Sequence, residues 1–189
     1  SYTWAKAIDD WTYNAFAQLT QQAYQDPLNR KAERGRIDSD IRHRWATSFL
    51  YSLPLWNGTQ WYARAFGGWE IGAIMIAASG SPFTVVSGRD NSLSGVGNDR
   101  PNVVGEWQLA DGRSRDERLA RYFNTTAFQP NAPLTFGNSG RNIISGPGSF
   151  SMDTSLSKSF RIVEQHRIQL RFDAFNLPNR ANFGDPNST

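Results

Sequence analysis

The sequence predicts an all-β chain of long antiparallel strands, each with one apolar and one polar face. Three observations support this prediction: alternating polarity in several segments, connections that alternate between short and long, and no apolar run long enough for a membrane-spanning helix. The clearest segment is 167–177, where successive side chains point to opposite faces of a strand. Its apolar face carries Ile168, Leu170, Phe172 and Ala174. Its polar face carries Arg167, Gln169, Arg171 and Asp173.

Two interpretations fit this segment taken alone. Its length of about ten residues is what a tilted strand needs to cross a bilayer, and its charged face carries both signs, as the wall of a water-filled pore does. The segment is then a membrane-spanning strand with lipid on one side and water on the other. A half-exposed strand of a soluble β-sandwich has the same alternation.

Four further segments are expected to form strands. Ile41–Leu53 and Met152–Ile162 alternate in the same way, with Leu50 and Lys158 as exceptions, and Lys158 near the end of a span is expected to extend its ammonium group to the membrane interface. Trp69–Ser79 is apolar on both faces, so its orientation is poorly specified. Tyr2–Ile8 is expected to form a ragged additional strand.

The connections between these strands alternate between long and short. Asp9–Asp40, Ser87–Phe150 and the tail after Leu177 are long and polar, whereas Leu55–Gly68 and Val163–His166 are shorter. Loops of more than about 15 residues are uncommon in compact soluble domains, whereas transmembrane barrels have long extracellular loops and short periplasmic turns. The pattern therefore favours an antiparallel transmembrane β-barrel segment, with the three long segments extracellular and the two shorter ones periplasmic.

Short helices are expected inside the long loops. Ala15–Gln25 has apolar residues at helical spacing, and Ser114–Tyr122 is a second candidate. Gly137–Asn142 and Gly146–Gly148 have the composition of tight turns, because Gly and Asn tolerate positive φ.

Composition excludes several classes of function. The net charge is only +3, and basic residues are interspersed with acidic ones, so the unbroken basic stripe of a nucleic-acid-binding protein is missing. The chain has no Cys, which excludes a disulfide scaffold and a thiol nucleophile. His43 and His166 have no metal-ligand spacing, and no phosphate-binding loop or nucleophile elbow is present. The sequence therefore predicts no enzyme, no metal site and no cofactor.

A series of short motifs resembles the large TonB-dependent outer-membrane receptors, in the branch that has an N-terminal carboxypeptidase-regulatory-like domain. These motifs follow the order of that family along nearly the whole chain: 26–35, 38–44, 67–72, 79–85, 100–102, 122–128, 136–142, 146–148, 153–158, 172–176 and 182–186. Each motif is weak alone, but the set agrees with the strand topology.

The resemblance implies that residues 1–189 are the C-terminal part of a receptor β-barrel, incomplete at both ends, that supplies about five strands and the outer loops. Such receptors sit in the Gram-negative outer membrane and take up scarce extracellular substrates with energy that TonB transmits. The implied partners are outer-membrane lipid, the receptor's own N-terminal plug domain, TonB through the N-terminal part, and a substrate that the sequence does not identify.

Two sets of site residues follow from this interpretation. The set expected to face the barrel lumen, where it hydrates the wall or holds the plug, is Arg42, Arg44, Glu70, Arg161, Gln169, Arg171 and Asp173. Aromatic residues of a long loop are expected to stack on the substrate: Trp107, Tyr122 and Phe123. Two alternatives stay open, a passive porin or adhesin barrel and a soluble glycan-binding β-sandwich.

Overall fold

The computed structural model describes residues 1–10, 25–26, 28–54, 58, 60–95, 99–163 and 166–188. The chain divides into two compact units. The sheet unit comprises Ser1–Trp4, Arg42–Ser79 and Gly148–Phe183. The loop unit comprises Ala5–Ile41, Gly80–Pro147 and Gly184–Thr189. No helix among the described residues has both the length and the apolar character needed to cross a membrane.

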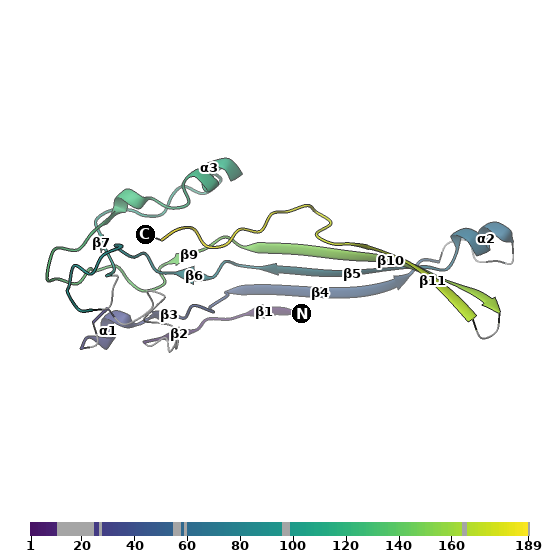
Figure 1. The fold of residues 1–189 in the computed structure, drawn as a ribbon, viewed down its shortest axis with the longest axis horizontal. Coiled ribbons are helices and arrows are strands. Elements are labelled where there is room, and N and C mark those ends of the chain that lie inside the picture. The colour runs from purple at the N-terminus through teal and green to yellow at the C-terminus, as the bar shows by residue number, and fades with distance from the viewer. Residues whose placement is uncertain are drawn as a thin grey trace. The chain divides into compact units, whose positions relative to one another are not determined.

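The described part of the sheet unit forms one antiparallel sheet of five strands, in the order β1-β4-β5-β10-β11 (Figure 1). The strands are β1 (Tyr2–Trp4), β4 (His43–Ser52), β5 (Trp69–Ala78), β10 (Ser149–Val163) and β11 (His166–Ala174). Each strand neighbours the next one of the sheet in chain order, as in an up-and-down meander. The predicted all-β antiparallel class and the predicted number of strands are confirmed.

The ends of two predicted strands are corrected. The strand expected over Tyr2–Ile8 stops at Trp4, because Ile8 belongs to the loop unit, where β2 (Ile8–Asp9) pairs with β3 (Gly35–Arg36). The strand expected up to Leu177 stops at Ala174. Beyond it Asn176 has φ 49° and its backbone N–H donates to Asp153 Oδ1 at 2.8 Å, which turns the chain away from the ladder.

The loop unit is assembled from segments that are far apart in the sequence. Two other strand pairs join its segments: β6 (Pro82–Phe83) with β9 (Ile144–Ser145), and β7 (Asn102–Val103) with β8 (Phe128–Gln129). Its helical turns are α1 (Arg30–Glu33), α3 (Arg115–Ala120) and the 3-10 turn η1 (Thr125–Ala127).

The helix predicted over Ser114–Tyr122 is confirmed as α3. Ser114 caps it reciprocally, since the Glu117 N–H donates to Ser114 Oγ at 3.2 Å and the Ser114 N–H donates to Glu117 Oε2 at 2.7 Å. The helix predicted over Ala15–Gln25 lies outside the described residues except for Gln25. Neither α1 nor α2 (Trp61–Phe66) was predicted, because each is too short to show a helical period.

A small apolar core lies within the loop unit. Phe83, Val85, Phe123 and Ile144 are buried together, and Phe123 lies 6.1 Å from Phe83 between ring centroids. The partly buried side chains packed against this core are Trp107, Tyr122, Phe128 and Ile143. Strands β6 and β9 bring Phe83 and Ile144 opposite each other, so residues 61 positions apart close the core.

Candidate functional site

One face of the large sheet is apolar across all of its long strands. Directly opposite residues of antiparallel strands share a face, so the register assigns each side chain. One row runs Tyr51, Ile71, Leu156 and Phe172, and another runs Thr47, Met75 and Met152. Pairing therefore resolves the orientation of Trp69–Ser79, which its sequence left open: Ile71, Ala73 and Met75 lie on the apolar face.

Several side chains of this face are solvent-exposed in the isolated chain, whereas Ala73 is buried. Phe172 is 60% exposed, Ile168 51% and Phe49 45%. A contiguous exposed apolar face of this kind marks a surface that another apolar phase covers.

Aromatic side chains bracket the apolar face along the strands. Tyr2, Trp45 and Phe150 share one row of the register, while Trp69 and Phe160 lie near the other end. Phe150 and Phe160 are ten residues apart on β10, which is about 33 Å along a strand and about 25 Å across a bilayer at a tilt of ~40°. This spacing is that of the two aromatic girdles of a transmembrane barrel.

Lys158 is the one cation among the described β10 residues of the apolar face, and it is only 4% exposed. Its Nζ lies 4.8 Å from the Phe160 ring centroid and 5.8 Å from that of Trp69. These cation–π contacts let an ammonium group remain on a face that is otherwise apolar.

The opposite face of the sheet is polar. Five serines of β10 alternate along it: Ser149, Ser151, Ser155, Ser157 and Ser159. The predicted lumen-facing residues that this face brings together are Arg44, Glu70, Arg161, Gln169, Arg171 and Asp173. Arg42 precedes β4 and is half-buried, so the register does not assign it to this face.

Two kinds of local contact organise the charged residues on the polar face. Arg171 Nε donates to Asp173 Oδ1 at 2.9 Å, and Ser52 Oγ donates to Glu70 Oε1 at 3.4 Å. Three large apolar residues interrupt the face, Leu50, Ile74 and Ile76, and two alanines, Ala46 and Ala78, also lie on it. Leu50 lies over Gly72, where an added Cβ would be 3.5 Å from Leu50 Cδ1 and 2.8 Å from Ser155 Oγ. A larger residue at position 72 would therefore require the Ser155 hydroxyl to move.

In the loop unit, the three predicted substrate-contacting aromatics meet in one cluster but differ in exposure. Phe123 is 6% exposed and its ring packs at 5.7 Å from that of Phe128, edge to face, so it is a core residue rather than the exposed aromatic that the sequence suggested. Trp107 and Tyr122 are partly exposed at the edge of the same core. The Trp107 carbonyl accepts from the Asn124 N–H at 2.9 Å, which fixes the two segments together.

Tyr122 has both an apolar and a polar environment. Its hydroxyl donates to the Ser145 carbonyl at 2.9 Å. Burial raises the pKa of the Tyr122 hydroxyl, and the negative charge of Asp185 raises it further. The phenol is therefore held neutral and available as a hydrogen-bond donor.

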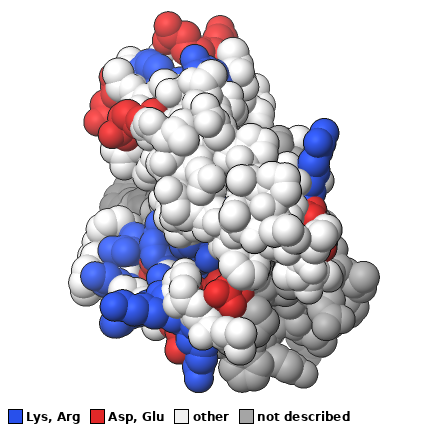
Figure 2. All heavy atoms as spheres, turned by 90° about the vertical axis from the view of Figure 1, so that its left-hand side faces the viewer, with Lys and Arg blue, Asp and Glu red and all other residues white. Residues whose placement is uncertain are grey.

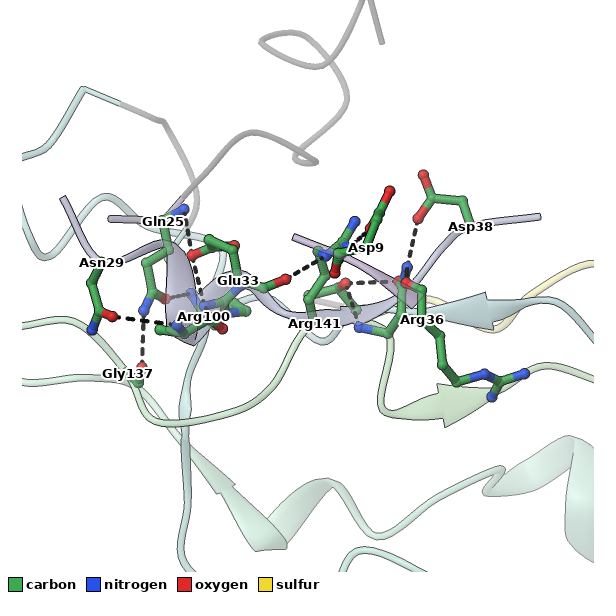
Figure 3. Close-up of polar contacts among 12 residues, drawn as sticks. Asp9, Gln25, Asn29, Glu33, Arg36, Asp38, Arg100, Gly137 and Arg141 are labelled. Carbon is green, nitrogen blue, oxygen red and sulfur yellow. Dashed lines mark hydrogen bonds and ion pairs between the residues drawn. The ribbon is translucent and has the colours of Figure 1, made fainter. Parts of the chain in front are cut away.

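A buried ion pair joins two distant segments of the loop unit (Figure 3). Arg100 donates to Glu33 through Nη1 at 2.8 Å and through Nη2 at 3.0 Å, and Glu33 is 1% exposed. Gln25 completes the arrangement, since its Nε2 donates to the Gly137 carbonyl at 2.9 Å and its Oε1 accepts from the Arg100 N–H at 2.8 Å. The bidentate pair is a direction-specific joint. Its Arg100 Nε is buried without a hydrogen-bond partner among the described residues.

Arg141 and Asn142 extend this joint to the first segment of the chain. Arg141 donates to the carbonyl oxygens of Glu33 and Asp9, each at 3.1 Å, and to the Asp9 carboxylate. Asn142 adopts φ 55°, and its side-chain amide donates to Asp38 Oδ1 at 2.6 Å and to the Arg36 carbonyl at 2.8 Å. The turn predicted over Gly137–Asn142 is thus a junction that binds residues more than 100 positions away.

Sequence reasoning missed these buried charges. Segment 30–36 looks like a solvated stretch of mixed charge, yet Glu33 turns inward to Arg100, and Arg36 donates to the buried Asp40 at 2.7 Å. The family resemblance was the one signal in the sequence that pointed to these segments. Four of its motifs contribute the residues that form these contacts: 26–35, 38–44, 100–102 and 136–142.

Asp99 is a second buried carboxylate of the loop unit. It accepts from the Ser92 N–H and Ser92 Oγ, both at 2.7 Å, and from Asn131 Nδ2 at 2.9 Å. Donors therefore occupy the oxygens that a cation would need. Over the described ranges no group of three or more His, Cys, Asp or Glu residues is arranged to hold a metal ion.

Figure 2 looks onto the side where Figure 1 draws α1, β7 and α3. Charged side chains of both signs lie toward its top and bottom, and uncharged side chains form a broad zone between them. This face has no field of a single sign, in agreement with the net charge of +3.

A family model described as "Outer membrane beta barrel domain" matches residues 1–189, which is the whole chain. Neither a curated protein nor a solved structure matches. The family match agrees with the apolar sheet face, its aromatic brackets and the antiparallel topology.

Proposed function

This chain belongs to the outer membrane beta barrel domain family, and we propose that it supplies barrel wall and outer loops to a TonB-dependent receptor. Its location is the cell outer membrane. The receptor takes up a scarce extracellular substrate. The β-sandwich alternative is wrong, because the family is one of outer-membrane barrels and the apolar sheet face is accounted for by lipid.

The observation that carries the proposal is the loop unit. The connections from β1 to β4 and from β5 to β10 build a folded body with its own apolar core and buried ion pairs. A binding site requires supporting residues that are fixed by packing and by hydrogen bonds. The Glu33–Arg100 joint supports a receptor role, because it fixes the loop unit in the way that a recognition surface requires.

In this proposal the polar face of the sheet lines the lumen. Arg44, Glu70 and Arg171 hydrate the wall, with Arg42, Arg161, Gln169 and Asp173 in the same role. The loop unit is extracellular, and the connections 55–68 and 163–166 are periplasmic. The plug domain and the TonB contact lie in the N-terminal part of the receptor, and the resemblance of the motifs supports this assignment.

Energy dependence distinguishes the receptor from the passive porin or adhesin. Cells that depend on the full-length protein for a candidate solute should lose uptake when TonB is deleted or when an uncoupler collapses the proton gradient. Uptake that survives both treatments would identify a passive barrel. A disrupted gene with unchanged uptake of every tested solute would favour the adhesin.

Trp107 and Tyr122 are the aromatic residues proposed to contact substrate, and Phe123 supports them from the core. Trp107→Ala and Tyr122→Ala should weaken substrate binding by the intact receptor while leaving its surface level unchanged. Phe123→Leu is the matched packing control, because it conserves an apolar side chain at a position that a ligand cannot reach directly. Unchanged uptake in the Trp107→Ala/Tyr122→Ala double variant would remove these residues from the site.

A further inference from the structure

We infer that Arg161 and Arg167 form an oxyanion-binding pair on the polar face of the β10–β11 hairpin, for a carboxylate or phosphate group. The inference rests on the proposed function in one respect only, that the polar face of the sheet lines a water-filled lumen. Its experiment measures stability rather than uptake, so it can fail independently of the receptor assignment.

The pair is defined by the strand register. Arg161 of β10 lies directly opposite Arg167 of β11, and both share the face of Ser159 and Gln169. Like charges placed directly opposite on two strands repel and destabilise the pairing. A negative charge bound by both arginines would remove this repulsion.

The described residues contain no counter-charge for this pair. Both arginine side chains are exposed, and neither makes a hydrogen bond or ion pair with the rest of the described chain. The neighbouring Arg171 is already bonded to Asp173 at 2.9 Å. Glu70 lies opposite Ser157, which is four residues along β10 from Arg161. The backbone positions of Glu70 and Arg161 are therefore about 14 Å apart.

The chemistry of two facing guanidinium groups selects the ligand. Each presents a planar fork of N–H donors, and carboxylate or phosphate oxygens accept from such forks in a bidentate manner. The negative group has two possible sources, a dissolved oxyanion such as phosphate or a carboxylate of another segment of the same protein. Both have the same contact chemistry.

The test measures the thermal midpoint of the full-length protein in detergent, in potassium phosphate and in potassium chloride at equal ionic strength. We expect Arg161→Gln and Arg167→Gln each to lower the midpoint by roughly 2–4 °C. The double variant should lose no more than either single variant, because one anion needs both side chains. Arg171→Gln is the matched control on the same face and should not change the response to phosphate.

The salt comparison identifies the source. A loss seen only in phosphate indicates a dissolved oxyanion, and an equal loss in both salts indicates a resident carboxylate. A midpoint of Arg161→Gln that is unchanged or raised in both salts would mean simple repulsion and would overturn the inference. The same holds if the phosphate response persists in the double variant, or if Glu164→Gln reproduces the loss. Arg161→Lys keeps the charge but not the fork, and should recover only part of the wild-type response.

Discussion

The sheet unit exposes apolar side chains, whereas the loop unit buries charged ones. In the sheet, Phe172 is 60% exposed and Leu170 44%, while in the loop unit Glu33, Asp40 and Asp99 are each 1% exposed. Both features depart from the usual arrangement of a soluble domain, although the loop unit also has an apolar core. Lipid explains the first feature, because it solvates apolar surface without cost. Paired donors explain the second, because a buried charge is tolerated only when its bonds are satisfied.

This difference predicts which substitutions should destabilise each unit. The sheet depends on which face a residue occupies, and any apolar side chain of suitable size will serve on the lipid side. The loop unit depends on particular partners, because removal of one member of a buried pair leaves the other member charged and unpaired. Substitutions should therefore have position-dependent effects in the sheet and partner-dependent effects in the loops.

The largest effect is expected from breaking the Glu33–Arg100 pair. Arg100→Met leaves the Glu33 carboxylate buried without its counter-ion, which should destabilise the loop unit by about 3–5 kcal/mol. Hydrogen exchange of peptides from 83–85 and 144–145 in the full-length protein would measure this local stability. Combining Arg100→Met with Glu33→Gln should recover part of the loss, because the double variant no longer buries an unpaired charge.

The matched control is the exposed pair of Arg30 and Asp10, joined at 2.9 Å with side-chain exposures of 64% and 46%. Arg30→Gln should change stability by about 0–1 kcal/mol, since water screens this pair. Equal effects of Arg100→Met and Arg30→Gln would show that the buried pair has no special role.

The second largest loss of stability is expected from an arginine substitution on the apolar face of β10. The comparison uses two adjacent residues that lie on opposite faces of the sheet. Met152→Arg places a cation on the apolar face, two residues inside the aromatic row of Phe150, and should destabilise the inserted protein by about 1–2 kcal/mol. Ser151→Arg makes the same chemical change on the polar face and should be tolerated. Folding yield and resistance to denaturation in detergent compare the two. If Ser151→Arg is the more damaging variant, the two faces have been assigned the wrong way round.

The sheet was predictable from the sequence and the loop unit was not, for a physical reason. The two environments of a strand are visible in a short stretch of sequence, because apolar and polar residues alternate. In β11 the apolar residues Ile168, Leu170 and Phe172 alternate with Arg167, Gln169 and Arg171. Only β5 was ambiguous, since Ile71 and Ile74 are both apolar, and its orientation came from pairing with β4 and β10.

Contacts in the loop unit join residues that are far apart in the sequence, and no local pattern identifies them as partners. Glu33 meets Arg100 across 67 positions, and Asn142 meets Asp38 across 104. Segment 30–36 therefore shows only mixed charge in the sequence, and Phe123 was predicted to be an exposed aromatic. The short helix α3 was predictable because its Ser114–Glu117 capping box lies within four residues.

A smaller effect is expected from Tyr122→Phe, which removes the hydrogen bond to the Ser145 carbonyl. Ser145 is exposed, so water replaces the lost donor, and the cost should be about 0.5–1.5 kcal/mol. The pKa of Tyr122 is raised by burial, so its stabilising contribution is complete below the unfolded value of 10.0 and is lost as pH rises through the folded value. Stability at pH 8 and at pH 11 should therefore differ more in the wild type than in Tyr122→Phe. An equal difference in both would assign the alkaline loss to other groups.

The smallest effect tests whether α3 depends on a local bond rather than on the buried network. Hydrogen bonds from Ser114, through its hydroxyl and its backbone N–H, lower the pKa of Glu117 below its usual 4.5. A lowered folded pKa gives stability that is present above the unfolded value and is lost as pH falls through the folded value. Exchange protection of peptide 114–121 should therefore fall on acidification below about pH 4.5. Glu117→Gln should abolish the dependence, because its neutral amide does not titrate. If Glu117→Gln loses protection over the same pH range as the wild type, the acid sensitivity of α3 comes from elsewhere in the loop unit, and the helix is not held independently by its cap.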